Sequence, residues 1–242
     1  MQSSLYVALS AQLTLQKRLE SIANNVANSS TAGFRAEEIR FETLLSETPL
    51  DPVSFVSSGD TYLSRRAGEI AKTDNPLDVA VQGEAWLAIQ TPAGTVYTRD
   101  GRMRISEAGQ LETLGGHPVL DAGGAPILIE AAAGPPQIGR DGMITQNGRQ
   151  MGAVGLFRID ERAHLTRYEN SGVMPDQPAV PALDFTNVGL LQGYVERSNV
   201  NPVMEMSRLI MVTRALEAVT ASINTAESSL EDAVQTLGST TG

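Results

Sequence analysis

The chain has 242 residues, of which 41% are hydrophobic and 19% are charged, a composition typical of a packed fold with one or two domains. Its formal net charge of −10 disfavours binding to nucleic acid and to anionic lipid, because both are negatively charged. The absence of cysteine excludes disulfides, thiolate metal sites and cysteine nucleophiles. Aromatic residues make up only 5% of the chain, so we expect a mostly aliphatic core.

The first ten residues carry no basic side chain, and polar side chains interrupt the apolar positions that follow them. We therefore expect no cleaved secretory signal. No stretch approaches the roughly 18 consecutive apolar residues that a membrane-spanning helix needs, so we expect no membrane insertion.

The N-terminal segment shows the periodicity of an amphipathic helix. Apolar or small residues recur three and four positions apart, except where Gln12 takes one position of the seam. The seam consists of Leu5, Ala8, Leu15, Leu19, Ile22 and Val26. We expect residues 1–35 to form an N-terminal helix together with its exit.

The C-terminal segment, residues 198–242, repeats this pattern without interruption. Asn201 and Pro202 are a plausible N-cap and first-turn proline, and Gly238 is placed where a glycine would end the helix. The seam consists of Leu209, Val212, Leu216, Val219, Ile223, Ala226, Leu230, Ala233 and Leu237. We expect a helix with a coiled-coil seam from Pro202 to Leu237.

A single amphipathic helix usually packs on the core of its own domain. Here the two seams lie at opposite ends of the chain, and the second covers about four heptads, which favours pairing of the helices with each other and with other chains. In an antiparallel pair, Glu20 would lie near Arg214, and Lys17 near Glu217. Such exposed pairs indicate the register more than they add stability.

Between the helices, short β-type runs alternate with turn signals such as Asp141-Gly142 and Asn147-Gly148. We expect residues 75–197 to form an all-β meander or small barrel, and residues 36–74 to form an extended connector. The expected strands are 86–90, 96–98, 103–105, 111–113, 118–120, 127–129, 143–145, 155–158, 165–168 and 189–195.

The sequence does not indicate an enzyme. His117 and His164 have no partner at metal-ligand spacing, and the phosphate-binding and nucleophile-elbow motifs are absent. Asp141 and the other carboxylates in turns are explained by their turns. We expect no catalytic residue, no metal, no cofactor and no small-molecule substrate.

Three motifs lie at the start, middle and end of the chain. The first is Ala23-Asn-Asn-Val-Ala-Asn-Ser-Ser-Thr-Ala-Gly-Phe-Arg35. The second is Asn75-Pro-Leu-Asp-Val-Ala-Val-Gln-Gly83, continued by Trp86-Leu-Ala-Ile-Gln-Thr91 and Tyr97-Thr-Arg-Asp-Gly101. The third is Gly193-Tyr-Val-Glu-Arg-Ser-Asn-Val-Asn-Pro-Val203. All three resemble motifs of flagellar rod and hook proteins.

In the first motif, the three asparagines are able to satisfy backbone groups at the helix terminus, while Gly33 permits a reversal and Phe34 returns to apolar surroundings. The candidate assembly residues are Leu5, Leu15, Leu19, Ile22, Asn24, Asn25, Val26, Asn28, Gly33, Phe34, Asn199, Asn201, Pro202, Leu209, Val212, Leu216, Val219, Ile223, Leu230 and Leu237.

The resemblance implies a structural subunit of the basal-body rod. Both terminal helices would form an inner tube domain, and the subunit would stack helically with copies of itself and with other rod subunits. It also implies export through the flagellar type III apparatus without cleavage of a leader.

Within the family, the short segment 41–70 resembles that of proximal rod proteins more than that of distal rod or hook proteins, although Val26 replaces the commoner leucine. A distal rod or hook-type subunit remains an alternative. A secreted adhesin or phage-tail fibre module with a coiled stalk is another, and would carry binding clusters at the tips of its β domain. A β-sandwich hydrolase would need a carboxylate pair or a Ser/His pocket.

Overall fold

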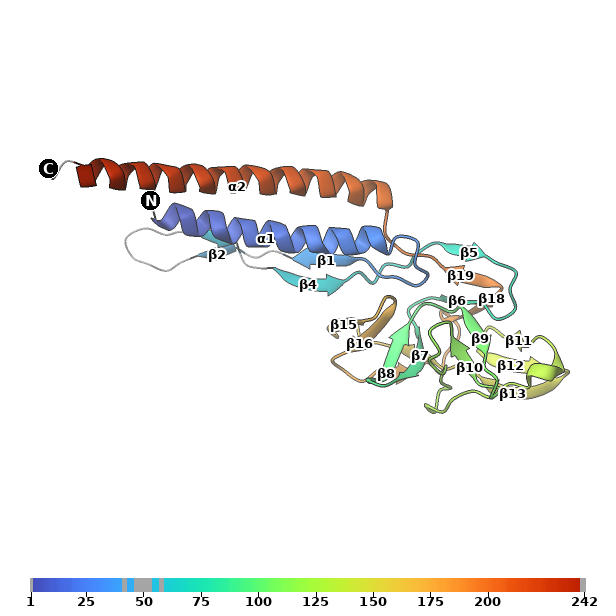
Figure 1. The fold of residues 1–242 in the computed structure, drawn as a ribbon. Helices are drawn as coiled ribbons and strands as arrows, with labels where there is room; N and C mark the ends of the chain where they lie inside the picture. The colour runs from blue at the N-terminus through green and yellow to red at the C-terminus, as the bar shows by residue number, and fades with distance from the viewer. Residues whose placement is uncertain (1, 41–42, 46–53, 57–58, 240–242) are drawn as a thin grey trace. The chain divides into compact units, whose positions relative to one another are not determined.

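The structure is a computed structural model that describes residues 2–40, 43–45, 54–56 and 59–239. It contains an N-terminal helix, a mostly β central region and a C-terminal helix, which confirms the mixed helix-and-sheet class (Figure 1). The chain forms two compact units. We call residues 1–27, 37–62 and 201–242 the helical unit, and residues 28–36 and 63–200 the β-rich unit.

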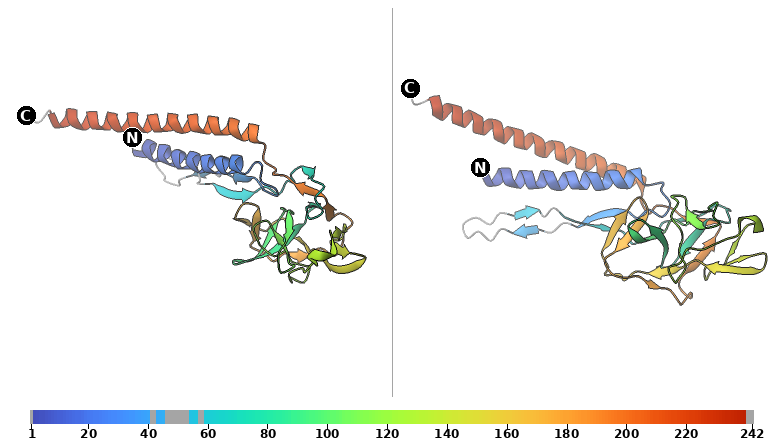
Figure 2. Two further views of the ribbon diagram at one scale, coloured as in Figure 1. Left: turned by 45° about the vertical axis from the view of Figure 1, so that its right-hand side comes forward. Right: turned by 60° about the horizontal axis from the view of Figure 1, so that its bottom comes forward.

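The helical unit contains α1 (Gln2–Ala27) and α2 (Pro202–Ser239), which lie side by side and run antiparallel (Figures 1 and 2). Asn201 caps α2 as predicted, because its Oδ1 accepts a hydrogen bond from the Met204 amide at 3.2 Å. The predicted stop after Leu237 was wrong, since α2 continues through Gly238 to Ser239. A glycine permits the left-handed turn that ends a helix but does not impose it.

Two pairs of short strands also belong mainly to this unit. In the first pair, β1 (Glu37–Arg40) lies next to β4 (Asp60–Leu63). In the second, β2 (Thr43–Leu45) lies next to β3 (Ser54–Val56). Both pairs fall within residues 36–74, where we expected an extended connector.

The antiparallel direction of the helices agrees with expectation, but neither expected charge pair forms an ion pair among the described residues. Lys17 Nζ donates instead to the Gly59 carbonyl at 2.5 Å. Among the described residues, no ion pair joins Glu20 to Arg214. Exposed ion pairs contribute about 0 to 1 kcal/mol and therefore do not hold a helix register by themselves.

The β-rich unit contains one six-stranded antiparallel sheet in the order β15-β16-β8-β7-β14-β17, one three-stranded sheet β11-β12-β13, and the pairs β9-β10, β6-β18 and β5-β19. The strands are β5 (Ile70–Lys72), β6 (Val79–Gln82), β7 (Trp86–Thr91), β8 (Gly94–Thr98), β9 (Met103–Ile105), β10 (Leu111–Thr113), β11 (Gln137–Ile138), β12 (Met143–Gln146), β13 (Arg149–Ala153), β14 (Leu156–Arg158), β15 (Leu165–Tyr168), β16 (Gly172–Pro175), β17 (Val180–Pro181), β18 (Gly189–Gln192) and β19 (Tyr194–Glu196). A 3₁₀ turn, η1 (Ala131–Ala133), precedes β11.

Several predicted strands are confirmed, and the bounds of β9, β10 and β15 agree with the prediction. Residues 118–120 and 127–129 form isolated bridges instead of strands, because Pro118 and Pro126 have no N–H to donate to a ladder. The predicted strand 189–195 is split into β18 and β19 at Gly193, whose φ is 79°. Such a left-handed residue interrupts extended backbone.

The turn predicted at Asn147-Gly148 joins β12 to β13, and both residues have positive φ, 49° and 76°. Two consecutive positive φ values define the hairpin turn that Asn-Gly favours. The hairpin therefore has the local geometry expected from its sequence.

The core of the β-rich unit is aliphatic, as the low aromatic content predicted. It contains Val79, Val81, Leu87, Val96, Leu111, Val119, Ile144 and Leu156, which are essentially inaccessible to solvent. These side chains come from both sheets and from the strand pairs, so one core holds the short strands together.

Neither described helix is long and apolar enough to cross a membrane. Within the described part of the chain, no three histidine, aspartate or glutamate side chains gather as metal ligands. His117 lies 3.6 Å from the Glu169 carboxylate, and His164 uses its backbone amide to bond Asp176.

Candidate functional site

The helical seam residues fall into three groups. Ile22 and Val212 are buried. Side chains of the second group are half-buried: Leu15, Leu19, Val26, Leu209, Leu216, Val219 and Ile223. The third group belongs to the two helices, but the structure does not describe its side chains; it consists of Leu5, Leu230 and Leu237.

A second set of apolar side chains on α2 is exposed to solvent. Val203, Met206 and Ile210 are spaced by three and four residues and are 73%, 53% and 56% exposed. Leu9 and Leu13 on α1 are also exposed. Contiguous exposed apolar side chains mark interaction surfaces, so the helical unit carries apolar surface that its own packing does not cover.

The last turns of α1 hold the backbone of Glu37. Asn25 is buried, and its side-chain amide both donates to the Glu37 carbonyl, at 2.9 Å, and accepts from the Glu37 amide, at 2.8 Å. Asn24 Nδ2 donates to the Glu37 carboxylate. For Asn25 our expectation of a helix-terminus role was incomplete, because its side chain joins α1 to the residue that starts β1.

The chain passes between the two units after residues 27, 36, 62 and 200. Within the β-rich unit, the segments next to these points are hydrogen-bonded to one another. The Gly33 amide donates to the Glu196 carbonyl at 2.8 Å, and the Ala36 amide donates to Asn199 Oδ1 at 2.7 Å. Asn199 Nδ2 donates to the Arg66 carbonyl at 2.8 Å, which adds the third segment.

A buried ion cluster lies at the centre of this convergence. The Glu196 carboxylate lies 2.7 Å from Arg35 Nη2 and 3.3 Å from Arg99 Nε, and it accepts a hydrogen bond from the Gly68 amide at 2.8 Å. All three charged side chains are almost inaccessible to solvent. We call Gly33, Phe34, Arg35, Arg99, Glu196 and Asn199 the junction.

Burial determines the electrostatics of the junction. It lowers the pKa of Arg35 to about 10 and also lowers the pKa of Arg99, while the neighbouring Glu196 opposes both shifts. Arg35 therefore stays protonated at neutral pH. The junction holds two cations and one anion in a region that water does not reach, so loss of the anion would leave both cations uncompensated.

Aromatic rings cover the arginines of the junction. The Arg35 and Arg99 guanidinium groups lie 5.5 and 5.6 Å from the centre of the Trp86 ring. Arg167 lies 4.2 Å from the centre of the Phe34 ring and donates to the Arg35 carbonyl at 2.7 Å. These cation–π contacts compensate part of the desolvation of the guanidinium groups.

Gly33 fits a position that no other residue would occupy without strain. Its φ is 68°, and a Cβ added there would lie 2.2 Å from the backbone nitrogen of Asp100. This agrees with the reversal that we predicted at Gly33. Nearby, Asn28 closes the turn after α1, because its carbonyl accepts from the Thr31 amide at 3.1 Å.

The structure thus brings Gly33, Phe34 and Asn199 together, while Asn25 and the seam residues belong to the helical unit. Sequence reasoning assigned no role to Arg35, Arg99 or Glu196, although each lies in one of the three motifs. The alternation of Val195 and Glu196 in a short β-type run would place the Glu196 carboxylate at the surface, so it gave no signal of the buried charge. Spacing along the chain could not show that these charges meet.

The junction is not arranged for catalysis. Its charged groups are paired with one another and almost inaccessible to solvent, so a dissolved substrate would not reach them. Its hydrogen bonds and ion pairs connect three chain segments, around residues 33–36, 66–68 and 196–199, near points where the chain passes out of the β-rich unit.

Three family profiles match the chain along its length. Residues 5–35 match "Flagella basal body rod protein", residues 80–146 match "Flagellar hook protein FlgE/F/G D1 domain", and residues 191–236 match "Flagellar basal body rod FlgEFG protein C-terminal".

The chain is also similar to curated proteins over nearly its whole length. It is 53% identical to the flagellar basal-body rod protein FlgF of Mesorhizobium japonicum, covering 99% of both chains. It is 49% identical to the protein of the same name from Rhizobium meliloti, covering 98% of this chain and 99% of that one. It is 37% identical to the flagellar basal-body rod protein FlgF of Caulobacter vibrioides, and the match covers 98% of this chain and 99% of that one.

These matches favour the rod interpretation over the adhesin, tail-fibre and hydrolase alternatives. Both the terminal helical segments and the β-rich segment between them are matched in order. The chain therefore belongs to the flagellar basal-body rod protein family, as a FlgF-like structural subunit of the basal body and not an enzyme.

Proposed function

We propose that the chain polymerises helically in the proximal part of the rod and contributes to a hollow shaft that transmits torque. The observation that carries this proposal is the apolar stripe of α2, Val203, Met206 and Ile210, which remains exposed when α1 and α2 are paired. A helix of this kind gains stability when a further helix covers the stripe.

In this proposal, residues 1–35 and 198–242 contribute a coiled-coil-like inner tube, residues 75–197 form a central β domain with hook-like or barrel character, and residues 36–74 connect them. The seam residues pair α1 with α2, and the exposed stripe meets neighbouring subunits. Contacts between two different surfaces of one chain build an open helical filament when the rotation from one subunit to the next does not close into a ring.

The junction supports the torque-bearing part of the proposal. A shaft transmits torque only if each subunit resists deformation, and side chains held by several buried hydrogen bonds and ion pairs resist sliding more than apolar contacts do. Glu196 receives such contacts from Arg35, Arg99 and Gly68. We infer that the junction limits how far the segments leading to the helices move under load.

The proposed partners are copies of this chain, other flagellar rod subunits and the flagellar type III export apparatus, with no cleaved leader. The names of the relatives support assembly in the basal-body rod. Mass spectrometry of the subunit from purified basal bodies tests the export proposal. A mature N-terminus created by cleavage of a leader, between about residues 15 and 31, would contradict it.

The polymerisation proposal is tested by cryo-electron microscopy of basal bodies that carry a tagged copy in a strain lacking the native gene. We expect the subunit in the proximal rod, with α1 and α2 lining the channel. Its recovery in the distal rod or hook would favour the distal alternative. Its absence from basal bodies of motile cells would overturn the proposal.

A further inference from the structure

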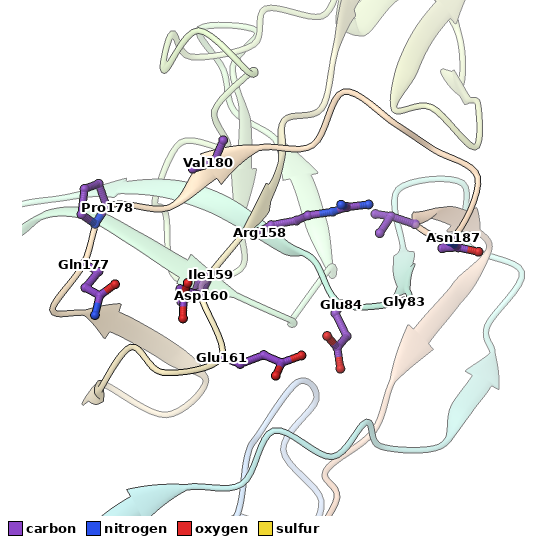
Figure 3. A pocket seen from close by; sticks show the side chains of 11 residues that line it. Gly83, Glu84, Arg158, Ile159, Asp160, Glu161, Gln177, Pro178, Val180 and Asn187 are labelled. Atoms are coloured by element: carbon purple, nitrogen blue, oxygen red, sulfur yellow. The ribbon is translucent and has the colours of Figure 1, made fainter.

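A groove of about 690 Å³ opens on the β-rich unit (Figure 3). Residues 83–84, which precede β7, form one wall, and residues 158–161, at the end of β14 and just after it, form another. Residues 177–178, 180 and 187–188 complete the groove. It is separate from the apolar stripe of α2, which belongs to the helical unit.

Two arginines fix the walls of the groove. Arg99 of the junction donates to the Gly83 carbonyl at 2.7 Å. Arg65 donates to the carbonyls of Asp160 and Ala163, each at 2.8 Å. Because side-chain bonds hold both walls, the groove is largely formed before anything enters it, which reduces the entropic cost of binding.

The lining of the groove includes both apolar and acidic side chains. Ile159 and Val180 supply apolar surface, and Val180 is 64% exposed. The carboxylates of Glu84 and Glu161 are directed toward the same part of the opening, while the Arg158 guanidinium extends toward Asn187 (Figure 3). This combination suits a cationic side chain with an aliphatic stem, above all an arginine.

The same unit carries an exposed arginine on a projecting element. Arg149 directly follows the Asn147-Gly148 turn, at the tip of the β12–β13 hairpin. Residues 147–150 are all exposed, and among the described contacts the Arg149 guanidinium has no hydrogen bond or ion pair. The exposed Arg162 belongs to the loop of the groove itself, so it is not available as a separate occupant.

We propose that the hairpin tip of one copy docks in the groove of a second copy, with Arg149 between Glu84 and Glu161. The charges are complementary, and the two surfaces are different parts of one chain. Such a contact is able to repeat from copy to copy, which is compatible with an open helical assembly. This inference rests on the proposed function and adds a specific contact between β-rich units.

The absence of native cysteine makes a crosslinking test clean. The variant Gln150→Cys/Gln177→Cys places one thiol at the hairpin tip and one at the groove. Mild oxidation of basal bodies carrying this variant is expected to give disulfide-linked dimers and higher multimers on a non-reducing gel, because the bond forms only when the Cα atoms are within about 7 Å. Each single-cysteine variant should give no such ladder.

A charge swap tests the chemistry of the contact in the same double-cysteine background. Arg149→Glu is expected to lower the crosslinked fraction at least tenfold, and adding Glu161→Arg should restore most of it. Arg149→Lys is the matched control, because it keeps the positive charge and should retain the crosslink. Loss of the crosslink in Arg149→Lys with retention in Arg149→Glu would overturn the proposed charge pairing.

The outcomes separate this inference from the proposed function. If the double-cysteine subunit is present in basal bodies at the wild-type level and no crosslink forms, the docking proposal is wrong while the rod function stands. Equal crosslinking by the single-cysteine variants would also overturn it. If the unmodified subunit is missing from basal bodies, the rod function itself fails.

Discussion

The two units of this protein bury apolar side chains to different extents. The β-rich unit has a continuous aliphatic core, with Val79, Leu111 and Ile144 completely buried. In the helical unit, Ile22 and Val212 are the hydrophobic side chains that reach full burial among the described residues. The comparison indicates that the β-rich unit is stable by itself, whereas the helical unit depends on further contacts.

The magnitudes support this difference. Complete burial of an aliphatic side chain contributes about 1.5 to 3 kcal/mol relative to exposure. Much of that contribution is unrealised along α2, where the seam is half-buried and the opposite stripe is exposed. Assembly would supply it, so changes in the helical unit should affect incorporation more than folding of the β-rich unit.

The largest expected effect is loss of incorporation in Leu216→Asp or Ile223→Asp. A charge on the seam loses its hydration without gaining a partner, at a cost of several kcal/mol. Basal bodies should contain less than a tenth of the wild-type amount of subunit, measured by immunoblot. Trp86 fluorescence should still report a folded β-rich unit, because this single tryptophan is buried there.

Ser222→Asp is the matched control for the seam variants, because it adds the same charge at an exposed position beside Ile223. It should incorporate normally. Equal incorporation of Ser222→Asp and Ile223→Asp would contradict the view that an intact seam is needed for incorporation.

The next largest effect is expected from Gly33→Ala. The added Cβ would overlap the Asp100 backbone, and the alanine would be held at positive φ. We therefore expect the free energy of unfolding to fall by about 3 kcal/mol or more, and the cells to stop swimming in soft agar. Gly124→Ala is the control, since Gly124 has a φ of 82° but no atom within 4 Å of the new Cβ. It should cost about 1 kcal/mol. Similar costs in urea unfolding would show that Gly33 is an ordinary turn residue.

Glu196→Gln tests the junction directly. Loss of the carboxylate charge leaves Arg35 and Arg99 buried without an anion, and the expected cost is about 3 to 5 kcal/mol. Glu69→Gln, which changes an exposed pair with Arg197, should cost less than about 0.5 kcal/mol. Urea unfolding followed by Trp86 fluorescence measures both variants. If the free energies of unfolding of the two variants differ by less than about 1 kcal/mol, the proposed structural role of the cluster is wrong.

In the isolated subunit, the β-rich unit should be folded at equilibrium while the helical unit is mostly unfolded. In dilute solution we expect little helix by circular dichroism, because the seam and the exposed stripe lack partner surfaces, together with native Trp86 fluorescence. Amide hydrogen exchange should be fast in α1 and α2 and slow in β7 and β8. Slow exchange throughout both helices of a dilute monomer would show that the helical unit is stable without assembly.

The smallest effect is expected where we assign no role beyond local structure. His117→Gln/His164→Gln should leave motility unchanged and the free energy of unfolding within about 0.5 kcal/mol of the wild-type value. Asp141→Asn should also be nearly silent, because the amide oxygen is still able to accept from the Met143 backbone amide, as Asp141 Oδ1 does at 3.1 Å. Loss of motility in these variants would reopen a chemical role for the histidines or for Asp141.

Local rules explain why part of this architecture follows from the sequence. The three-and-four spacing of apolar residues predicted both helices, Asn201 and Pro202 predicted the start of α2, and Asn147-Gly148 predicted a hairpin turn. The short motif around Gly33 predicted a reversal that requires positive φ. Each of these features depends on residues that are close together in the chain.

Tertiary structure alone decided the junction, the split of residues 189–195 and the groove. Arg35 and Arg99 meet Glu196 across separations of more than 90 residues along the chain, and their side chains are compatible with exposed positions until the strands bring them together. Periodicity describes which face of an element is apolar, but it contains no information on which distant charges become neighbours. That pairing is determined by how the β-rich core packs, because burial of a charge is tolerated only where an opposite charge and hydrogen-bond donors are already in place.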